Sequence, residues 1–216
     1  MLSNLGNLGN LASPAQLSDF VPLAQRAVSV EANSMIRFRA AQHTVAGYVR
    51  LPYEVLAART VAAEQAGSFD ITVAAVDFVR WAEQSGPVPA GKDAHWLSPL
   101  PPRAGWRRIE VVPDEVVRAL VSAGAHLAAS ADSRQSQESL LASIVLIATP
   151  APGTAPQEPV QVPLGPLSAL TRMGFLPRDS QVAVDVSPGW IRVAAALGST
   201  FVGSGSGQLG ILSLGG

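Results

Sequence analysis

The residue types that could do chemistry are few in this chain. It has no cysteine, a single lysine at Lys92, and three histidines, His43, His95 and His126, that lie far apart in the sequence. Short metal-binding and thiol signatures need closely spaced His or Cys residues. Neither a G-x-x-x-x-G-K-[ST] phosphate loop nor a G-x-S-x-G serine motif occurs. We therefore expect no metal, no cofactor and no assigned catalytic residue, and we lean towards a protein that is not an enzyme.

One local pattern occurs twice and could bind a ligand. The segments Gly105-Trp106-Arg107-Arg108-Ile109 and Gly189-Trp190-Ile191-Arg192-Val193 both have the order Gly-Trp-x-Arg-aliphatic. In a strand, the Trp and the second Arg share a face, and a guanidinium beside an indole can hold an anion or stack on a flat ligand. The candidate contacts for a ligand or partner are Arg103, Trp106, Arg108, Trp190 and Arg192. The structural alternative is a glycine turn entering a strand, with Trp covering the edge of the core and Arg stacked across it.

Two other features have simpler explanations. Gly205-Ser206-Gly207-Gln208-Leu209-Gly210 fits the G-x-G-x-x-G fingerprint, but six residues remain after it, too few for the helix that would cradle a pyrophosphate. We interpret it as part of a glycine-rich tail. Asp114 and Glu115 stand at a predicted helix start, where the helix dipole explains two carboxylates without catalysis.

Composition limits the possible partners. Hydrophobic residues make up 48% of the chain and charged residues 14%, and the net charge is −1. A surface so poor in charge is prone to self-association, and nucleic-acid binding would need a local basic patch. No signal-peptide pattern and no apolar run long enough to span a bilayer is present. We expect a soluble, cytoplasmic protein with no membrane contact.

Periodicity in the first half predicts mixed structure. We expect a helix from Pro14 to about Val28, then a β-hairpin in which Ile36, Phe38 and Ala40 alternate with arginines before a break at Ala41-Gln42. A helix from Leu51 to about Ala66, a strand over 69–73 and a further helix after Val76 complete this part.

The second half continues in the same style. A strand begins at Gly105, and a helix begins at Pro113. The stretch from Arg134 to Ile147 is predicted as helix, with Ile144–Thr149 open as a buried strand. After a proline-rich stretch, we expect a helix over 167–175 and strands over 181–186, 190–195 and 198–202.

Hairpin signals outnumber crossovers, which favours an α+β fold with mostly antiparallel strands and packed helices, in one large domain or two similar-sized lobes. The expected organisation is a flexible arm over 1–13, an N-terminal α+β lobe over 14–84, a proline-rich linker or loop over 85–104, a C-terminal α+β lobe over 105–202 with a proline-rich loop at 149–166, and a glycine-rich tail over 203–216.

Several segments resemble conserved hypothetical proteins of actinobacteria. These are Pro102-Arg103-Ala104-Gly105-Trp106, Leu170-Thr171-Arg172-Met173-Gly174-Phe175-Leu176, and Gly189 to Val193 with Gly198-Ser199-Thr200. The resemblance covers the C-terminal half and implies a bacterial source and a cytoplasmic setting. That family has no assigned activity, so it implies no site residues.

Three hypotheses about function follow. The first is a non-enzymatic interaction or assembly module that associates with itself or with another protein. The second is a small-molecule or anion-binding protein that uses the Arg/Trp residues, with enzymatic activity left open. The third is a winged-helix-like DNA-binding protein that uses Arg172, Arg178 and Arg192.

Overall fold

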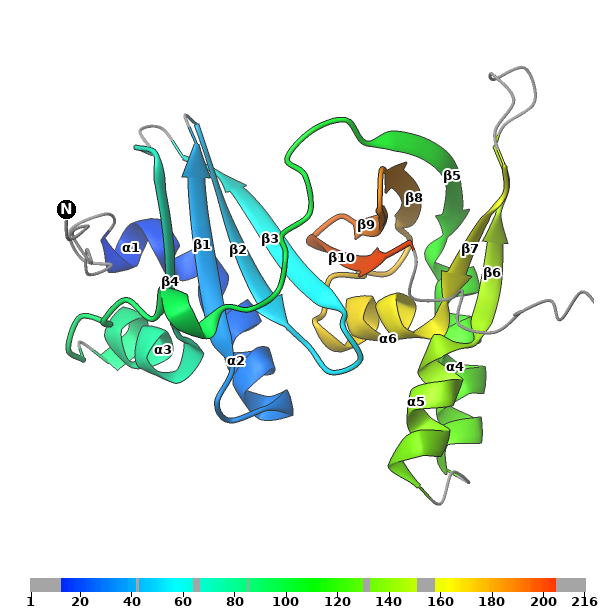
Figure 1. The fold of residues 1–216 in the computed structure, drawn as a ribbon, viewed down its shortest axis with the longest axis horizontal. Helices are drawn as coiled ribbons and strands as arrows, with labels where there is room; N and C mark the ends of the chain where they lie inside the picture. The colour runs from blue at the N-terminus through cyan, green and yellow to red at the C-terminus, as the bar shows by residue number, and fades with distance from the viewer. Residues whose placement is uncertain are drawn as a thin grey trace, which may run out of the picture. The chain divides into compact units, whose positions relative to one another are not determined.

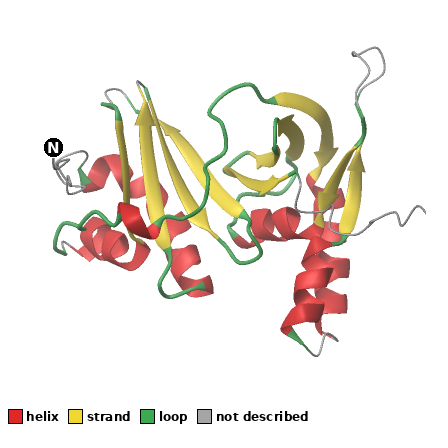
Figure 2. Ribbon diagram, viewed as in Figure 1, coloured by secondary structure: helices red, strands yellow, loops and turns green. Residues whose placement is uncertain are grey.

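The computed structural model describes residues 13–41, 43–63, 67–84, 86–129, 133–150 and 158–204 (Figure 1). The chain forms two compact units: Met1–Pro52 with Leu56–Leu100 in unit 1, and Tyr53–Val55 with Pro101–Gly216 in unit 2. Nearly all of the predicted arm and tail lies outside the described residues. The predicted α+β class with mostly antiparallel strands is confirmed, and of the two arrangements left open from sequence the chain has two similar lobes (Figure 2).

Unit 1 is a four-stranded antiparallel sheet with helices on one face. Its strands are β1 (Met35–Ala41), β2 (Thr44–Arg50), β3 (Leu56–Ala62) and β4 (Phe69–Ala74), in the order β4-β1-β2-β3. Its helices are α1 (Pro14–Leu17), α2 (Val21–Val30) and α3 (Ala75–Gln84), with short 3-10 turns η2 (Ser18–Phe20) and η3 (Asp93–His95).

Three phenylalanines form the centre of this unit. Phe38 of β1 lies between Phe20 and Phe78, with ring centroids 5.3 and 5.0 Å away, and all three side chains are fully buried. Strand β2 has a glycine, Gly47, where the Phe20 ring packs against it, because a Cβ at that position would lie 2.7 Å from the ring. Alternation along β1 turns Arg37 and Arg39 to the opposite face.

Unit 2 repeats the sheet with different helices. Its strands β5 (Arg107–Pro113), β8 (Gln181–Ser187), β9 (Trp190–Ala195) and β10 (Gly198–Gly203) lie in the order β5-β8-β9-β10, and β6 (Ile144–Ala148) pairs with β7 (Val160–Pro163) in a separate two-stranded sheet. Its helices are α4 (Asp114–Ala129), α5 (Arg134–Ala142) and α6 (Leu164–Arg172).

The two units have the same arrangement of strands, but these strands follow one another in a different order along the chain. In each, three consecutive strands form a meander, and a fourth strand pairs beside the first strand of that meander. This fourth strand runs directly into a helix in both units, β4 into α3 and β5 into α4. However, it follows the meander in unit 1 and precedes it in unit 2, so the repeat is not visible as a sequence period.

Helix α6 is the buried helix of unit 2. Six of its nine residues are buried, including Leu164, Leu167 and Leu170. Thr200 of β10 donates a hydrogen bond to the carbonyl of Pro166 at 2.9 Å, which identifies the sheet face that α6 covers. Helix α4 packs against α6 at Gly124, where a Cβ would lie 2.4 Å from Leu164.

Two sequence expectations are wrong, and a third segment, left open between helix and strand, is now decided. The helix predicted from Leu51 to Ala66 is wrong: Tyr53 and Glu54 adopt left-handed φ angles of 64° and 58°, which end any helix, and β3 follows. The segment Ile144–Ala148, for which a helix end and a buried strand were both open, is a strand, and only Ala148 in it is buried. Strand β7 lies inside the predicted proline-rich loop at 149–166, because Val160 and Val162 find backbone partners on β6.

Candidate functional site

Residues of the doubled Gly-Trp-x-Arg pattern meet on the face of the unit 2 sheet opposite α6. Asp185 on the central strand β8 lies directly across from Arg108 on β5 and from Arg192 on β9. Phe201 on β10 continues the same row. Because Thr200 faces α6, its neighbour Phe201 and the whole row face the other way.

Asp185 binds both arginines. Arg108 Nε donates to Oδ1 at 2.9 Å, while Arg192 Nε and Nη2 donate to Oδ2 at 3.0 and 2.8 Å. The Asp185 side chain is 2% exposed, whereas that of Arg108 is 58% exposed. A carboxylate buried this deeply in a sheet needs such charged partners, and the group of three retains one net positive charge.

Trp106 packs against Arg192 of this group. The Arg192 guanidinium carbon lies 4.5 Å from the centroid of the Trp106 ring, and the ring packs at 5.7 Å from Phe201. The indole Nε1 donates to the carbonyl of Pro102 at 2.9 Å. Arg192 therefore lies over the tryptophan of the other sequence copy, Trp106, and not over Trp190. We call Trp106, Arg108, Asp185, Arg192 and Phe201 the Arg/Trp cluster.

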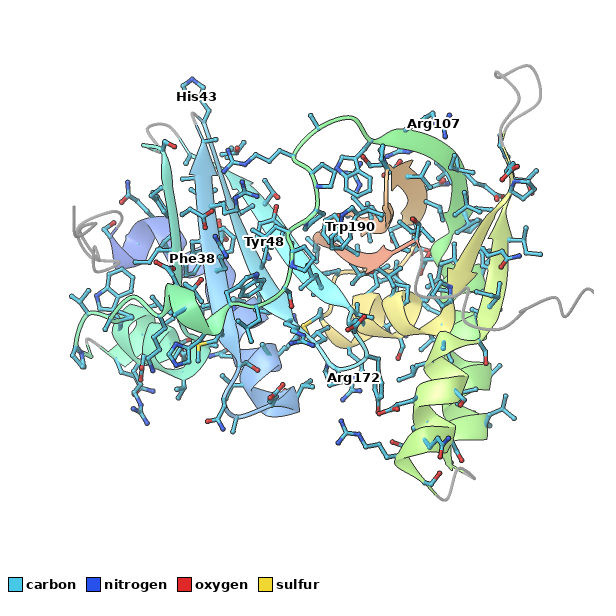
Figure 3. The ribbon with its side chains drawn as sticks, viewed as in Figure 1. Phe38, His43, Tyr48, Arg107, Arg172 and Trp190 are labelled. Carbon is cyan, nitrogen blue, oxygen red and sulfur yellow. The ribbon has the colours of Figure 1, made fainter. Side chains whose placement is uncertain are left out.

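The structure brings together three of the five predicted contact residues. Trp106, Arg108 and Arg192 are in the cluster. Trp190, labelled in Figure 3, is half-buried at the start of β9, opposite Ser187 and Gly203. Arg103 is exposed in the segment before β5.

The glycine turns of the structural alternative match the observed geometry in both segments, whereas the Arg–Trp stacking joins Arg192 of one segment to Trp106 of the other. Gly105 and Gly189 have φ angles of 80° and 76°, so both are turns that enter strands. Asp185 was not among the contact residues predicted from sequence. It is a lone carboxylate in the apolar run Val182–Val186, and such a pattern indicates a buried charge that has charged partners.

Unit 1 has a similar group of one aspartate and two arginines, which is more exposed than the Asp185 group of unit 2. Asp70 of β4 lies 2.6 Å from Arg37 Nε and 3.2 Å from Arg39 Nε, and its side chain is 38% exposed. The hydrogen bond to Asp70 raises the pKa of Arg37. Both sheets thus hold one aspartate between two arginines on the face away from the central helices.

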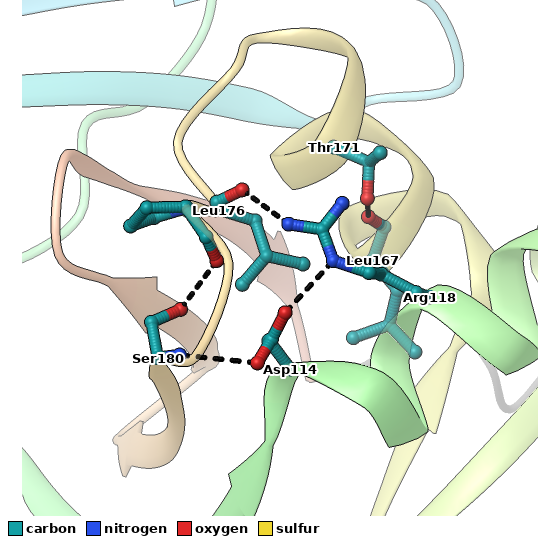
Figure 4. Close-up of polar contacts among 7 residues, drawn as sticks. Asp114, Arg118, Leu167, Thr171, Leu176 and Ser180 are labelled. Carbon is teal, nitrogen blue, oxygen red and sulfur yellow. Dashed lines mark hydrogen bonds and ion pairs between the residues drawn. The ribbon is translucent and has the colours of Figure 1, made fainter.

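A second buried carboxylate links α4 to the loop between α6 and β8 (Figure 4). Asp114, at the start of α4, accepts hydrogen bonds from Arg118 Nε at 2.8 Å and from the Ser180 backbone N–H at 3.0 Å. Arg118 also donates to the carbonyl of Leu176 at 2.7 Å. The Arg118 hydrogen bond holds the pKa of Asp114 below its ordinary value. The helix-start carboxylate predicted from sequence is therefore also a brace for the loop before β8.

A small cavity of about 70 Å³ lies within unit 2. Its walls are mainly apolar, with one carboxylate at Glu138, and include Val55, Leu141, Pro163, Pro166 and Val202. Pockets for small-molecule ligands usually enclose about 300–1,000 Å³. This cavity has room for one small aliphatic side chain and not for a cofactor.

Within the described ranges, no three His, Asp or Glu side chains gather in a way that could hold a metal ion. In that same part of the chain, no helix is both long and apolar enough to cross a membrane.

Two family models match the sequence. A domain of unknown function, DUF8010, matches residues 10–95, and a second one, DUF8185, matches residues 101–207. No curated protein matches the sequence.

Solved structures show which fold this is. The DNA polymerase III subunit beta from Pseudomonas aeruginosa superposes with a TM-score of 0.58 at 15% identity, covering 87% of this chain and 63% of that one. The DNA polymerase sliding clamp from Bacillus subtilis gives 0.58 at 14% identity, with 87% and 63% covered. The clamp from Caulobacter crescentus gives 0.54 at 15% identity, with 89% and 64% covered. The chain thus spans under two thirds of the length of these clamps. It has the fold of the bacterial DNA polymerase sliding clamp.

Proposed function

We propose that this chain is a non-enzymatic protein-interaction module built on the sliding-clamp fold. The observation that carries the proposal is the set of large apolar side chains exposed on unit 2. Leu127 of α4 is 61% exposed and Ile147 of β6 is 60% exposed. Val111, Val116, Ile144 and Leu197 are also exposed in the same unit. In a chain with few charges, these side chains give unit 2 apolar surface that is available to another protein.

The charge on the helices argues against a role that depends on DNA. Helices α1 to α6 carry five arginines, Arg26, Arg80, Arg118, Arg134 and Arg172. They also carry five carboxylates, Asp77, Glu83, Asp114, Glu115 and Glu138. A surface that follows a duplex must offset about one negative charge per 1.7 Å of helix axis. Neither the helices, with no net charge, nor the whole chain, with a net charge of −1, supplies that attraction.

The winged-helix hypothesis has a separate difficulty. It requires a helix near Arg172 whose face can enter a DNA groove. Helix α6 instead directs Leu164, Leu167 and Leu170 into its own core. Arg192, the third basic residue of that hypothesis, is held by Asp185.

The anion-binding hypothesis has limited support from the Arg/Trp cluster. Asp185 already occupies Arg192, and Arg192 covers one face of Trp106. Bracing of β5, β8 and β9 accounts for these contacts.

Site-specific photo-crosslinking in cells tests the proposal. A photoreactive amino acid replaces Leu127 or Ile147 in the full chain, and Glu31, an exposed polar residue at the end of α2, serves as the control position. We expect discrete protein adducts from Leu127 and Ile147 and none from Glu31. Nucleic-acid adducts at the two apolar positions, or no adduct at either, would overturn the proposed function.

A further inference from the structure

Helix α4 is apolar around most of its circumference. Val117 and Gly124 are buried, and Gly124 marks the side that packs on α6. Yet Val116 is 40% exposed, and Leu127 is 61% exposed. Ala119 and Ala123 between them are exposed as well. A helix of a soluble protein normally presents charged and polar residues on its free side, so this helix has the surface of one that is covered by a partner.

The exposed apolar residues form one continuous stripe. At about 3.6 residues per turn, positions 116, 119, 123 and 127 fall within a sector roughly 80° wide. We call Val116, Ala119, Ala123 and Leu127 the α4 stripe. The packed side of α4, at Val117 and Gly124, lies about 100° further round, so the stripe is not the edge of the existing α4–α6 contact.

A carboxylate and an imidazole flank the stripe on one side only. Glu115 and His126 are eleven residues apart, which is close to three full turns, so both project from the same flank. His126 Nδ1 lies 2.9 Å from the carbonyl oxygen of Ser122. A carbonyl only accepts, so Nδ1 donates its proton there and Nε2 remains for another contact.

We propose that the α4 stripe pairs antiparallel with the same stripe of a second copy of this chain. The proposal rests on the proposed function and names its partner. In an antiparallel helix pair, like flanks face each other, so Glu115 of one copy lies opposite His126 of the other, twice. At the centre, Ala119 faces Ala123 of the second copy, and these small side chains allow the helix axes to approach to about 8 Å. The stripe is therefore complementary to itself in shape, and its flank becomes complementary in charge when His126 Nε2 takes up a proton and donates it to Glu115.

One edge strand of each four-stranded sheet, β4 in unit 1 and β5 in unit 2, is poorly suited to the same task. At the edge strand β4, Thr72 N–H donates to Asp93 Oδ1 at 2.6 Å, and the Thr72 carbonyl accepts from Lys92 N–H at 2.7 Å. Another strand cannot bond to Thr72 while this segment holds it. The edge strand β5 contains a bulge between Arg108 and Glu110 and ends at Pro113, two features that discourage strand addition.

The expected association is weak. One helix pair buries less than the roughly 1,200 Å² typical of stable interfaces, so the dimer should form only as concentration rises. Sedimentation of the full chain should show the mean mass rising from 22.4 kDa towards twice that value.

Two substitutions on one helix give the first test. Ala123→Glu places a charge in the stripe, and Ala125→Glu places the same charge on the opposite exposed side of α4. We expect Ala123→Glu to weaken association at least about tenfold and Ala125→Glu to leave it unchanged, with equal melting temperatures for the two variants. If Ala123→Glu does not weaken the dimer, or if both variants weaken it equally, the α4 pairing is wrong.

A charge exchange tests the register. Glu115→Lys should weaken association, and adding His126→Glu should restore it, because the introduced lysine of each copy then faces the introduced glutamate of the other. Failure of the double variant to recover would exclude this register. A wild-type chain that stays monomeric, or a dimer that is lost when residues 1–12 or 205–216 are removed, would refute the pairing. Crosslinks from Leu127 to other proteins, with none at twice the chain mass, would refute it while leaving the proposed function intact.

Discussion

At the scale of single residues, burial rather than chemical type decides how much an aspartate contributes to the stability of the fold. Asp185 and Asp70 both sit between two arginines on a sheet, at 2% and 38% side-chain exposure. Water solvates Asp70 and competes with its partners, so its ion pairs contribute little. Asp185 has only Arg108 and Arg192 to satisfy it. The same three-residue pattern is therefore a surface pair in unit 1 and a structural brace in unit 2.

Replacement of each aspartate should separate the two cases. Asp185→Asn leaves two neighbouring guanidinium groups without their anion and should lower the free energy of unfolding by about 2 kcal/mol. Asp70→Asn should lower it by about 0.5 kcal/mol or less. Urea denaturation of the two variants measures both values, and equal losses would contradict the assigned brace.

Asp114 makes stability depend on pH. Its pKa is lowered in the folded chain, chiefly by the Arg118 hydrogen bond, so the folded state favours the ionised form. This contribution is present above the ordinary aspartate pKa of about 3.9 and is lost as pH falls through the lowered value. Asp114→Asn should reduce the melting temperature at neutral pH, and the difference should shrink below about pH 4. Glu158→Gln, at an exposed position, is the control, and a difference that stays constant with pH would argue against this linkage.

At the scale of elements, pairing with a neighbouring strand outweighs the preference of the residues themselves for helix. The sequence of β3, Leu-Ala-Ala-Arg-Thr-Val-Ala, is rich in residues that suit a helix. Yet each residue from Leu56 to Ala62 pairs with one on β2, and these backbone hydrogen bonds decide the outcome. The preceding turn, with Tyr53 and Glu54 at positive φ, sets the direction in which the strand leaves.

The fit between helix and sheet in unit 1 depends on Gly47. A Cβ there would lie 2.7 Å from Phe20, whose ring is fixed edge-on against Phe38. Gly47→Ala should therefore lower the free energy of unfolding by about 1–3 kcal/mol, the usual effect of overfilling a packed core. Gly67→Ala is the matched control, because no atom lies within 4 Å of the added Cβ. Thermal unfolding of both variants is the measurement, and a neutral Gly47→Ala would show that Phe20 can move freely.

For the whole molecule, the same sheet arrangement is built twice, from two segments that match different family models. Sheet order and strand-to-helix connection agree between the units, while the fourth strand enters at opposite ends of the chain order. The likeness to sliding clamps supports the fold. The equal numbers of acidic and basic residues on α1 to α6, and the apolar side chains exposed on α4 and β6, come from this chain's own residues and not from that likeness.

The sequence by itself determined the local elements with clear periodicity. The hairpin of β1 and β2, the start of α4 and the strands β8, β9 and β10 follow from alternation, turn residues and helix-start signals within short windows. The scarcity of catalytic residue types and the α+β class followed from composition and from the number of hairpins.

Only the tertiary structure decided which side chains meet. Arg108 reaches Asp185 from 77 residues away, and Trp106 receives Arg192 from the second sequence copy. Strand β3 and strand β7 exist because distant strands supply their hydrogen bonds. Such contacts depend on sheet register between remote segments, which no local window of sequence encodes.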